Sequence, residues 1–152
     1  MENQIVMFKS CFPNSDVGDS IDNEKEIYNS LLGYFSENPN KMFLLITPPP
    51  MQNISDPSKT RELANWLVAA DGWRDDYDGG NLFVFDLYNV LTSPNNHHHL
   101  VDGNEVHETG DGSNTLYYDS SGDDHPNSQG NVKATEDFIP LLNFWYKEFL
   151  EN

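Results

Sequence analysis

The segment Met42-Phe43-Leu44-Leu45-Ile46-Thr47-Pro48-Pro49-Pro50 decides the fold expected for this chain. Its first five residues are all apolar, which is typical of a strand buried on both faces of a parallel sheet. The three prolines must end the strand, because proline cannot donate to the hydrogen-bond ladder of a sheet. The segment therefore predicts a buried parallel strand with an abrupt turn at its carboxyl end.

Two other apolar runs have a similar composition, one from Gln4 to Cys11 and one from Asn81 to Leu87. Between the three runs lie two segments with apolar residues at helical spacing. The first helix is expected to start at Asp22 or Asn23, and the second at Asp56-Pro57-Ser58. Their expected apolar faces are Ile27, Tyr28, Leu31, Leu32 and Phe35 in the first helix, and Leu63, Trp66, Leu67 and Ala70 in the second.

A last helix is expected from about Ser128 to Leu150, and Pro140 should kink or divide it. Its expected core stripe is Phe138, Leu141, Leu142, Trp145 and Phe149. Strands that alternate with helices predict a parallel sheet with helices on both faces, an α/β fold of three layers. The 152 residues suffice for a single domain over 1–152. In such sheets the ligand crevice lies beyond the carboxyl ends of the strands.

The segment from Tyr88 to Asp124 differs from the rest of the chain, because it is rich in Asn, Asp, Gly, Ser and His. We expect a long polar loop over 88–124, and such a loop in a compact domain usually has a function. The run His97-His98-His99, with Asp102 and His107 nearby, raises the question of a metal site. Adjacent histidines point in different directions on an extended chain, and the spacing fits no helical zinc motif. Adventitious binding is therefore favoured over a built site, and neither a metal nor a cofactor is expected.

The charge balance excludes several classes of partner. Eight Lys and Arg residues stand against 25 Asp and Glu, which gives a formal net charge of −17. Such a field repels nucleic acid and anionic membrane surfaces, so neither is expected as a partner. Cys11 is the single cysteine, which excludes an intrachain disulfide. No apolar run approaches the roughly 20 residues of a membrane span. Met1-Glu2-Asn3-Gln4 lacks the features of a signal peptide, so a cytoplasmic chain is expected.

The stretch Asp123-Asp124-His125-Pro126-Asn127 is the strongest candidate for a catalytic site. A carboxylate beside a histidine orients the imidazole and stabilises its protonated form, as a general base in acyl transfer requires. Pro126 stiffens the backbone next to the ring, and Asn127 or Ser128 can cap the helix that follows. The alternative is a solvated helix start in which His125 has no chemical role.

This stretch resembles the C-terminal block of the SGNH (GDSL-type) hydrolases, in which an aspartate–histidine pair serves a serine nucleophile on a different loop. The resemblance implies a flavodoxin-like α/β/α fold with a short parallel sheet. The family's aspartate precedes the histidine by three residues, a position that Gly122 holds here. Either Asp123 or Asp124 is therefore expected to orient His125.

The stretch from Ile5 to Asp16 is similar to the strand and loop of a divergent SGNH branch, and the resemblance gives Asn14 the role of oxyanion donor. In the family, a strand, loop and helix that carry the serine precede this strand. The chain is therefore expected to be N-terminally shortened, or a fragment of a longer protein. Gly18-Asp19-Ser20 spells the family's signature tripeptide, so Ser20 is a candidate nucleophile and Ser10 a second one.

The expected function is hydrolysis of a small acyl or acetyl ester, such as an acylated carbohydrate, with His125 as the general base. The competing expectation is a non-catalytic or truncated SGNH-like module for binding or assembly. Trp73 and Tyr77, in a polar segment, are the candidates for sugar contacts, whereas Trp66 on a helical face is expected in the core. The first strand lacks its family neighbour, and a bare apolar edge predicts a homo-oligomer.

Overall fold

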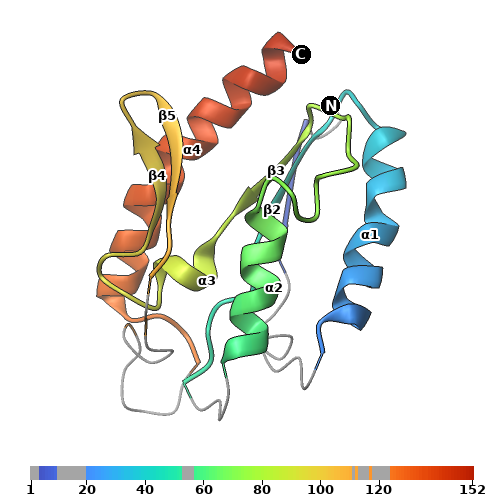
Figure 1. Ribbon diagram of the computed structural model, residues 1–152. Coiled ribbons are helices and arrows are strands. Elements are labelled where there is room, and N and C mark those ends of the chain that lie inside the picture. The colour runs from blue at the N-terminus through green and yellow to red at the C-terminus, as the bar shows by residue number, and fades with distance from the viewer. Residues whose placement is uncertain (1–3, 10–19, 53–56, 111, 113–116, 118–123) are drawn as a thin grey trace.

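A parallel sheet of three strands forms the centre of the protein (Figure 1). The computed structural model describes residues 4–9, 20–52, 57–110, 112, 117 and 124–152. The strands β1 (Ile5–Lys9), β2 (Met42–Ile46) and β3 (Leu82–Phe85) lie in the order β1-β2-β3, and each pairs in parallel with its neighbour. The predicted parallel sheet of an α/β protein is thereby confirmed.

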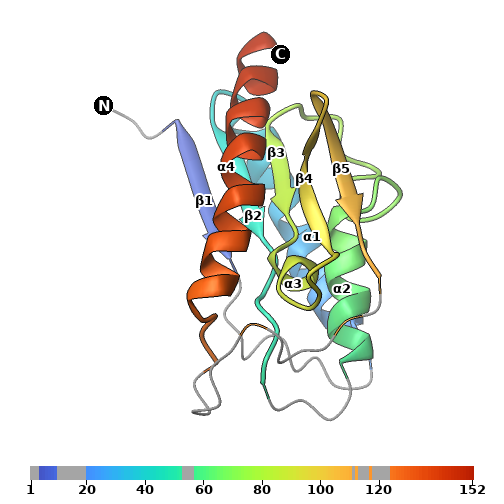
Figure 2. The ribbon, with the colours of Figure 1, turned by 90° about the vertical axis from the view of Figure 1, so that its left-hand side faces the viewer.

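Helices cover both faces of this sheet. Successive side chains of a strand point to opposite faces, and β2 and β3 are apolar at every position, so both faces must be buried. On one side, Phe43, Leu45 and Val84 belong to a core shared with α1 (Asp22–Ser36) and α2 (Ser58–Val68). On the other side, a second core joins strands and helix α4 (Ser128–Glu151); its buried residues are Met42, Leu44, Phe85, Val90, Leu141 and Trp145. Figure 2 shows α4 in front of the sheet and α1 and α2 behind it.

Among the described residues, β1 is one of the two edge strands of the sheet. Ile5 pairs with Met42 and Met7 pairs with Leu44, so all four side chains point to the face that α4 covers. Met42 and Leu44 are fully buried, whereas Ile5 and Met7 are 38% and 47% exposed. The helix therefore covers the centre of the sheet and leaves the same face of β1 open.

The expectation of a continuous polar loop over 88–124 is wrong for much of its length. The segment begins inside a short helix, α3 (Leu87–Val90), and then forms a hairpin of β4 (His97–Val101) and β5 (Asn104–Glu108). The hairpin turn is Asp102-Gly103, with φ angles of 51° and 81°. An Asp-Gly pair adopts this left-handed turn readily and signals a hairpin. The two strands were not predicted because most of their side chains are polar and give no apolar run.

Several local expectations about the helices need correction. Ile27 and Ala70 are exposed, and Ala70 lies beyond the end of α2. The helix α4 is not divided at Pro140, since it runs as one element from Ser128 to Glu151. Trp73 is not a surface aromatic: it is 2% exposed and packs edge-on against Tyr28 with ring centroids 5.3 Å apart. None of the helices in the described part of the chain is long and apolar enough to cross a membrane.

Candidate functional site

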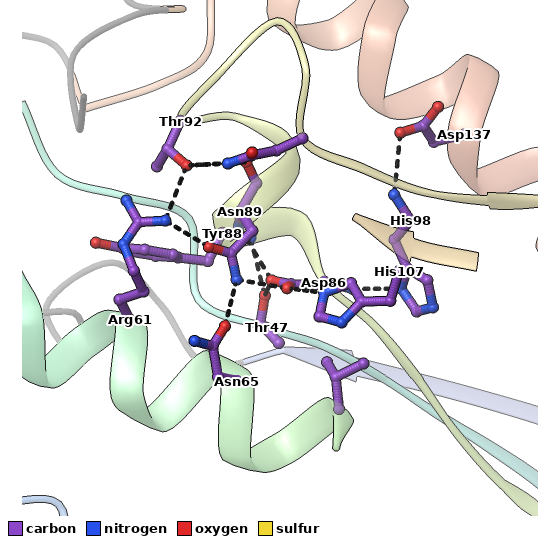
Figure 3. Close-up of polar contacts among 12 residues, drawn as sticks. Thr47, Arg61, Asn65, Asp86, Tyr88, Asn89, Thr92, His98, His107 and Asp137 are labelled. Atoms are coloured by element: carbon purple, nitrogen blue, oxygen red, sulfur yellow. Dashed lines mark hydrogen bonds and ion pairs between the residues drawn. The ribbon is translucent and has the colours of Figure 1, made fainter. Parts of the chain in front are cut away.

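A polar network lies beyond the carboxyl end of β3, and Asp86 is at its centre (Figure 3). The Asp86 carboxylate is fully buried and accepts hydrogen bonds from the Asn89 backbone N–H at 3.0 Å, from Asn89 Nδ2 at 2.6 Å and from Thr47 Oγ1 at 3.2 Å. Burial opposes ionisation, but the hydrogen bonds from His107 and Asn89 outweigh it, so the pKa of Asp86 lies below its ordinary value. Asp86 is therefore an ionised carboxylate inside the protein.

His107 on β5 approaches this carboxylate from the hairpin. Its Nε2 lies 2.5 Å from Asp86 Oδ2. Because the ionised carboxylate can only accept, Nε2 carries the hydrogen, and Nδ1 is the nitrogen that can take up a proton. None of the described residues forms a hydrogen bond with His107 Nδ1. The pair has the chemistry of a histidine base held in one tautomer by a carboxylate.

The ring of His107 also lines an open hollow of about 590 Å³. The other lining residues are Ser93, Asn95, Asn96, Glu108, Thr109 and Gly110. A quarter of the His107 side chain is exposed, whereas its partner Asp86 is completely enclosed. Solvent or a small polar ligand can therefore reach the imidazole but not the carboxylate behind it.

His98 joins the hairpin to the sheet through a second, fully buried imidazole. The backbone N–H of Asp86 donates to His98 Nδ1 at 3.0 Å, so Nδ1 is unprotonated and Nε2 carries the hydrogen. Nε2 then donates to Glu105 Oε1 at 2.9 Å, and Trp145 Nε1 donates to Glu105 Oε2 at 2.7 Å. Burial raises the pKa of Glu105, but these two hydrogen bonds outweigh it and the pKa is lowered. Three elements are thus connected through one carboxylate.

The helix α2 supplies the opposite wall of the network. Arg61 donates to Asn89 Oδ1 at 2.6 Å, and the guanidinium lies 5.4 Å from the centre of the Tyr88 ring. Asn89 also donates through Nδ2 to Asn65 Oδ1 at 2.9 Å. Burial, opposed by Arg61, raises the pKa of Tyr88 to about 12, so its hydroxyl stays protonated at neutral pH. These contacts hold α2 and α3 together beside Asp86.

A buried ammonium group fixes the segment between α3 and β4. Lys133 of α4 donates to the carbonyl oxygens of Val90 at 2.6 Å and Ser93 at 3.0 Å, and to that of Asn96 as well. Burial lowers the pKa of Lys133, an effect that the nearby Asp137 opposes. Ser93 and Asn96 also line the hollow beside His107, so Lys133 holds two of its lining residues in place.

Two further histidines, His97 and His99, lie beside the carboxylate of Asp137 on α4. His97 and His99 alternate with His98 along β4, and their rings stack with centroids 4.8 Å apart. His97 Nδ1 lies 3.1 Å from both carboxylate oxygens of Asp137, and His99 Nδ1 lies 3.8 Å from Oδ1. Two imidazoles and one carboxylate are a donor set suited to a divalent transition metal.

The residues predicted from the sequence lie elsewhere. Asp123, Asn14 and Ser10 lie outside the described residues. His125 is exposed, while Asp124 accepts a hydrogen bond from the Gln52 backbone N–H at 2.9 Å. Ser20 lies just before α1: its hydroxyl donates to Asp22 Oδ2 at 2.7 Å and accepts from the Asp22 backbone N–H at 3.1 Å.

Neither Asp86 nor Lys133 was predicted from the sequence as a site residue, and His107 was considered only as a metal ligand. A signal for Asp86 was present, since a carboxylate directly after a buried apolar strand is costly unless it has partners. The alternation of His97, His98 and His99 was also visible, because an extended chain puts the first and third histidine on one face. No comparable signal pointed to Lys133, whose three acceptors are backbone carbonyls.

The comparisons with known proteins add no relative: no family model, no curated protein and no solved structure matches this chain. The polar network around Asp86 and the segment around His125 are therefore interpreted from their own geometry and chemistry.

Proposed function

We propose that this chain is an ester hydrolase of the SGNH kind, acting on a small acyl or acetyl ester such as an acylated carbohydrate. His125 is its general base, and Asp123 or Asp124 orients the imidazole. Ser20, or Ser10, is the candidate nucleophile, and Asn14 the candidate oxyanion donor. The proposal rests on chemistry that these residue types share with the family and on where Asp124 and His125 lie relative to the sheet.

One contact carries the proposal. The hydrogen bond from the Gln52 backbone N–H to Asp124 Oδ1 joins the segment before α4 to the segment that follows β2, 72 residues away in the sequence. Both segments lie at the end of the molecule where the parallel strands finish (Figure 1). Ligand crevices of parallel α/β sheets lie at this end, so His125 next to Asp124 stands where a substrate is expected.

Asp123 is preferred over Asp124 as the partner of His125, because residues two apart can converge in a tight turn where neighbours diverge. A carboxylate accepts through both of its oxygens, so the Gln52 contact at Asp124 Oδ1 is compatible with either aspartate. Ser20 is a weaker candidate than the tripeptide suggests, since its hydroxyl donates to Asp22 at the start of α1 and not to His125. Attack by Ser20 would require that this hydrogen bond break and that the proton pass to His125 instead.

The pair of Asp86 and His107 supports a second candidate for the base. Its Oδ2–Nε2 distance of 2.5 Å and its position beside an open hollow meet the geometric requirements for base catalysis, here with a water molecule as the nucleophile. The non-catalytic alternative is that this pair only fastens the hairpin to the sheet. In that case the chain is a binding or assembly module, and the exposed edge of β1 supports association with a second copy.

Turnover of p-nitrophenyl acetate by the purified chain and by two matched variants tests these proposals. His125→Ala should lower kcat by orders of magnitude with little change in the thermal midpoint. His107→Gln, whose amide can still donate to Asp86, should retain turnover. The reverse pattern would assign the base to His107. Equal turnover in both variants and the unmodified chain, or no turnover above buffer in any of them, would remove the hydrolase proposal.

The partner of His125 and the nucleophile are identified by the same assay. Asp123→Asn should lower kcat much more than Asp124→Asn, because a base in the wrong tautomer is disabled. Ser20→Ala and Ser10→Ala should separate the two candidate serines, and a burst of p-nitrophenol would report an acyl-enzyme. Small, equal effects of both aspartate substitutions would mean that neither carboxylate orients the ring.

A further inference from the structure

We propose that His97, His99 and Asp137 form a binding site for one divalent transition-metal ion of the zinc class. The site is separate from both candidate bases, and it does not depend on the proposed hydrolase activity. It lies where the hairpin meets α4, with two ligands from β4 and one from the helix. Adventitious metal binding was expected from the sequence because adjacent histidines point in different directions. The two histidine ligands proposed here, His97 and His99, are instead two residues apart.

The backbone explains why these two histidines converge. Side chains of a strand alternate, so His97 and His99 share one face of β4 while His98 points to the other. His98 is fully buried against the sheet and stacks on Phe85 with ring centroids 5.7 Å apart. Because His98 fixes the rotation of the strand, its two neighbours must face away from β3 and toward Asp137.

The distances suit a metal after small side-chain rotations. One ligand atom from each of the three residues lies within 4.8 Å of the others. Tetrahedral zinc with bonds of about 2.0–2.1 Å separates its ligands by about 3.3 Å, so an approach of up to about 1.5 Å is needed. The carboxylate is already held in place, because the His98 backbone N–H donates to Asp137 Oδ2 at 3.3 Å. A fixed outer contact of this kind orients a ligand.

The two ring nitrogens of His99 face different carboxylates, with Nδ1 toward Asp137 and Nε2 toward Glu108. His99 Nε2 is buried and has no hydrogen-bond partner among the described residues. The nearest carboxylate oxygen given for it, Oε2 of Glu108, is 3.9 Å away, too far for a hydrogen bond. Buried polar groups in native proteins are nearly always paired, so a nitrogen left this way calls for a missing partner. Because Nδ1 is the nitrogen that lies 3.8 Å from Asp137, a metal shared with Asp137 binds through Nδ1, and Nε2 then carries the hydrogen and can donate to Glu108 after a small movement.

Access and charge also fit a cation. The side chains of His97 and His99 are each 27% exposed, whereas that of Asp137 is 6% exposed, so an ion can enter from solvent and meet a carboxylate at the base of the site. The chain carries a formal net charge of −17, which raises the local concentration of cations. The competing interpretation is a set of protonated histidines paired with Asp137, and it requires no metal.

Titration of the chelator-treated full chain with Zn²⁺, and with Co²⁺ as a spectroscopic substitute, tests the site. One equivalent should bind per chain, and the Co²⁺ complex should show the intense visible absorption of a site with four ligands. Zn²⁺ should also raise the thermal midpoint, since a ligand that binds only the folded state stabilises it. In ¹⁵N spectra of the histidine rings, the signals of His97 and His99 should shift, and those of His98 should keep the tautomer that its hydrogen bonds dictate.

Matched substitutions distinguish a built site from scattered binding. His97→Gln and His99→Gln should each weaken Zn²⁺ binding more than about 10-fold, the lower bound seen even for outer-shell partners. His125→Gln, which removes an exposed histidine elsewhere, should bind as the unmodified chain does. Binding that persists in the double variant His97→Gln/His99→Gln, or the absence of stoichiometric binding by the unmodified chain, overturns the proposal. If a variant does not fold, the ring ¹⁵N shifts of the unmodified chain decide.

Discussion

The carboxylate of Asp86 shows how single side chains determine this site. It is fully buried, and it remains ionised because His107, Asn89 and Thr47 all donate to it. Removing one partner of this buried carboxylate should destabilise the folded protein strongly, because the remaining buried polar groups then lack their hydrogen bonds. Catalytic or not, the pair of Asp86 and His107 therefore contributes to the stability of the fold.

The pKa directions of Asp86 and Glu105 predict a loss of stability in acid. Both pKa values are lowered in the folded protein, so each group's contribution is fully present above its unfolded pKa, about 3.9 for Asp and 4.3 for Glu. The contribution is lost as pH falls through the lower folded pKa. Urea unfolding as a function of pH should therefore show a free energy of unfolding that declines below about pH 5.

The variant Asp86→Asn isolates the share of this one carboxylate. At neutral pH it should lower the free energy of unfolding by about 2–4 kcal/mol. Its stability should also fall less steeply in acid than that of the unmodified chain, because the titrating group is gone. A variant with unchanged stability and an unchanged pH profile would show that Asp86 is already protonated in the folded state.

Among the helices and strands, the contact between α4 and the segment before β4 joins parts of the chain that are 37 to 43 residues apart in the sequence. Lys133 donates to the backbone carbonyl oxygens of Val90, Ser93 and Asn96. The segment from Val90 to Asn96 is therefore ordered by a side chain from another element. The same contact holds His97 near Asp137, one turn further along α4.

Replacement of this lysine should loosen the segment specifically. Lys133→Met keeps most of the apolar stem but leaves three carbonyls without their donor, so the free energy of unfolding should fall by about 2–4 kcal/mol. Amide hydrogen exchange should accelerate most in residues 91–98. Lys147→Met is the matched control, because Lys147 is exposed on the same helix and should change stability by less than about 0.5 kcal/mol. Equal effects of the two substitutions would contradict the role of Lys133.

For the molecule as a whole, the uncovered edge at β1 is the feature that its three layers do not explain. The face of β1 toward α4 exposes Ile5 and Met7, and the outer backbone of this strand has no partner strand among the described residues. Exposed apolar strand edges are templates for pairing. Since a second copy of the chain presents the same edge, a symmetric pair of β1 strands is the simplest way to cover it.

Light scattering of the purified chain at micromolar concentration should accordingly give a mass near twice the 17.3 kDa of one chain. Met7→Lys should shift the mass to that of a monomer, because a charge on the exposed face opposes pairing. Ile27→Lys is the matched control, since Ile27 is 59% exposed on α1, on the opposite side of the sheet, and should leave the dimer intact. A monomer mass for the unmodified chain, independent of concentration, would contradict association through this edge.

The order of residues alone predicted the three strands, the helices α1, α2 and α4, and the parallel sheet. These features follow from local periodicity: apolar runs such as Met42 to Ile46 must be buried, and residues at helical spacing share one face. The hairpin was missed although Asp102-Gly103 marked its turn, because the strands on either side carry polar side chains. Trp73 was wrongly expected at the surface, because its neighbours in the sequence are polar although its own side chain is buried.

The site itself depended on packing between elements that are distant in sequence. Asp86, His98, His107, Lys133 and Asp137 come from the end of β3, from the hairpin and from α4. No local pattern pairs Asp86 with His107, because hydrogen bonds between elements depend on how the hairpin and α4 dock against the sheet. That docking is directed by the apolar faces of the elements, and the polar groups meet only after those faces are buried.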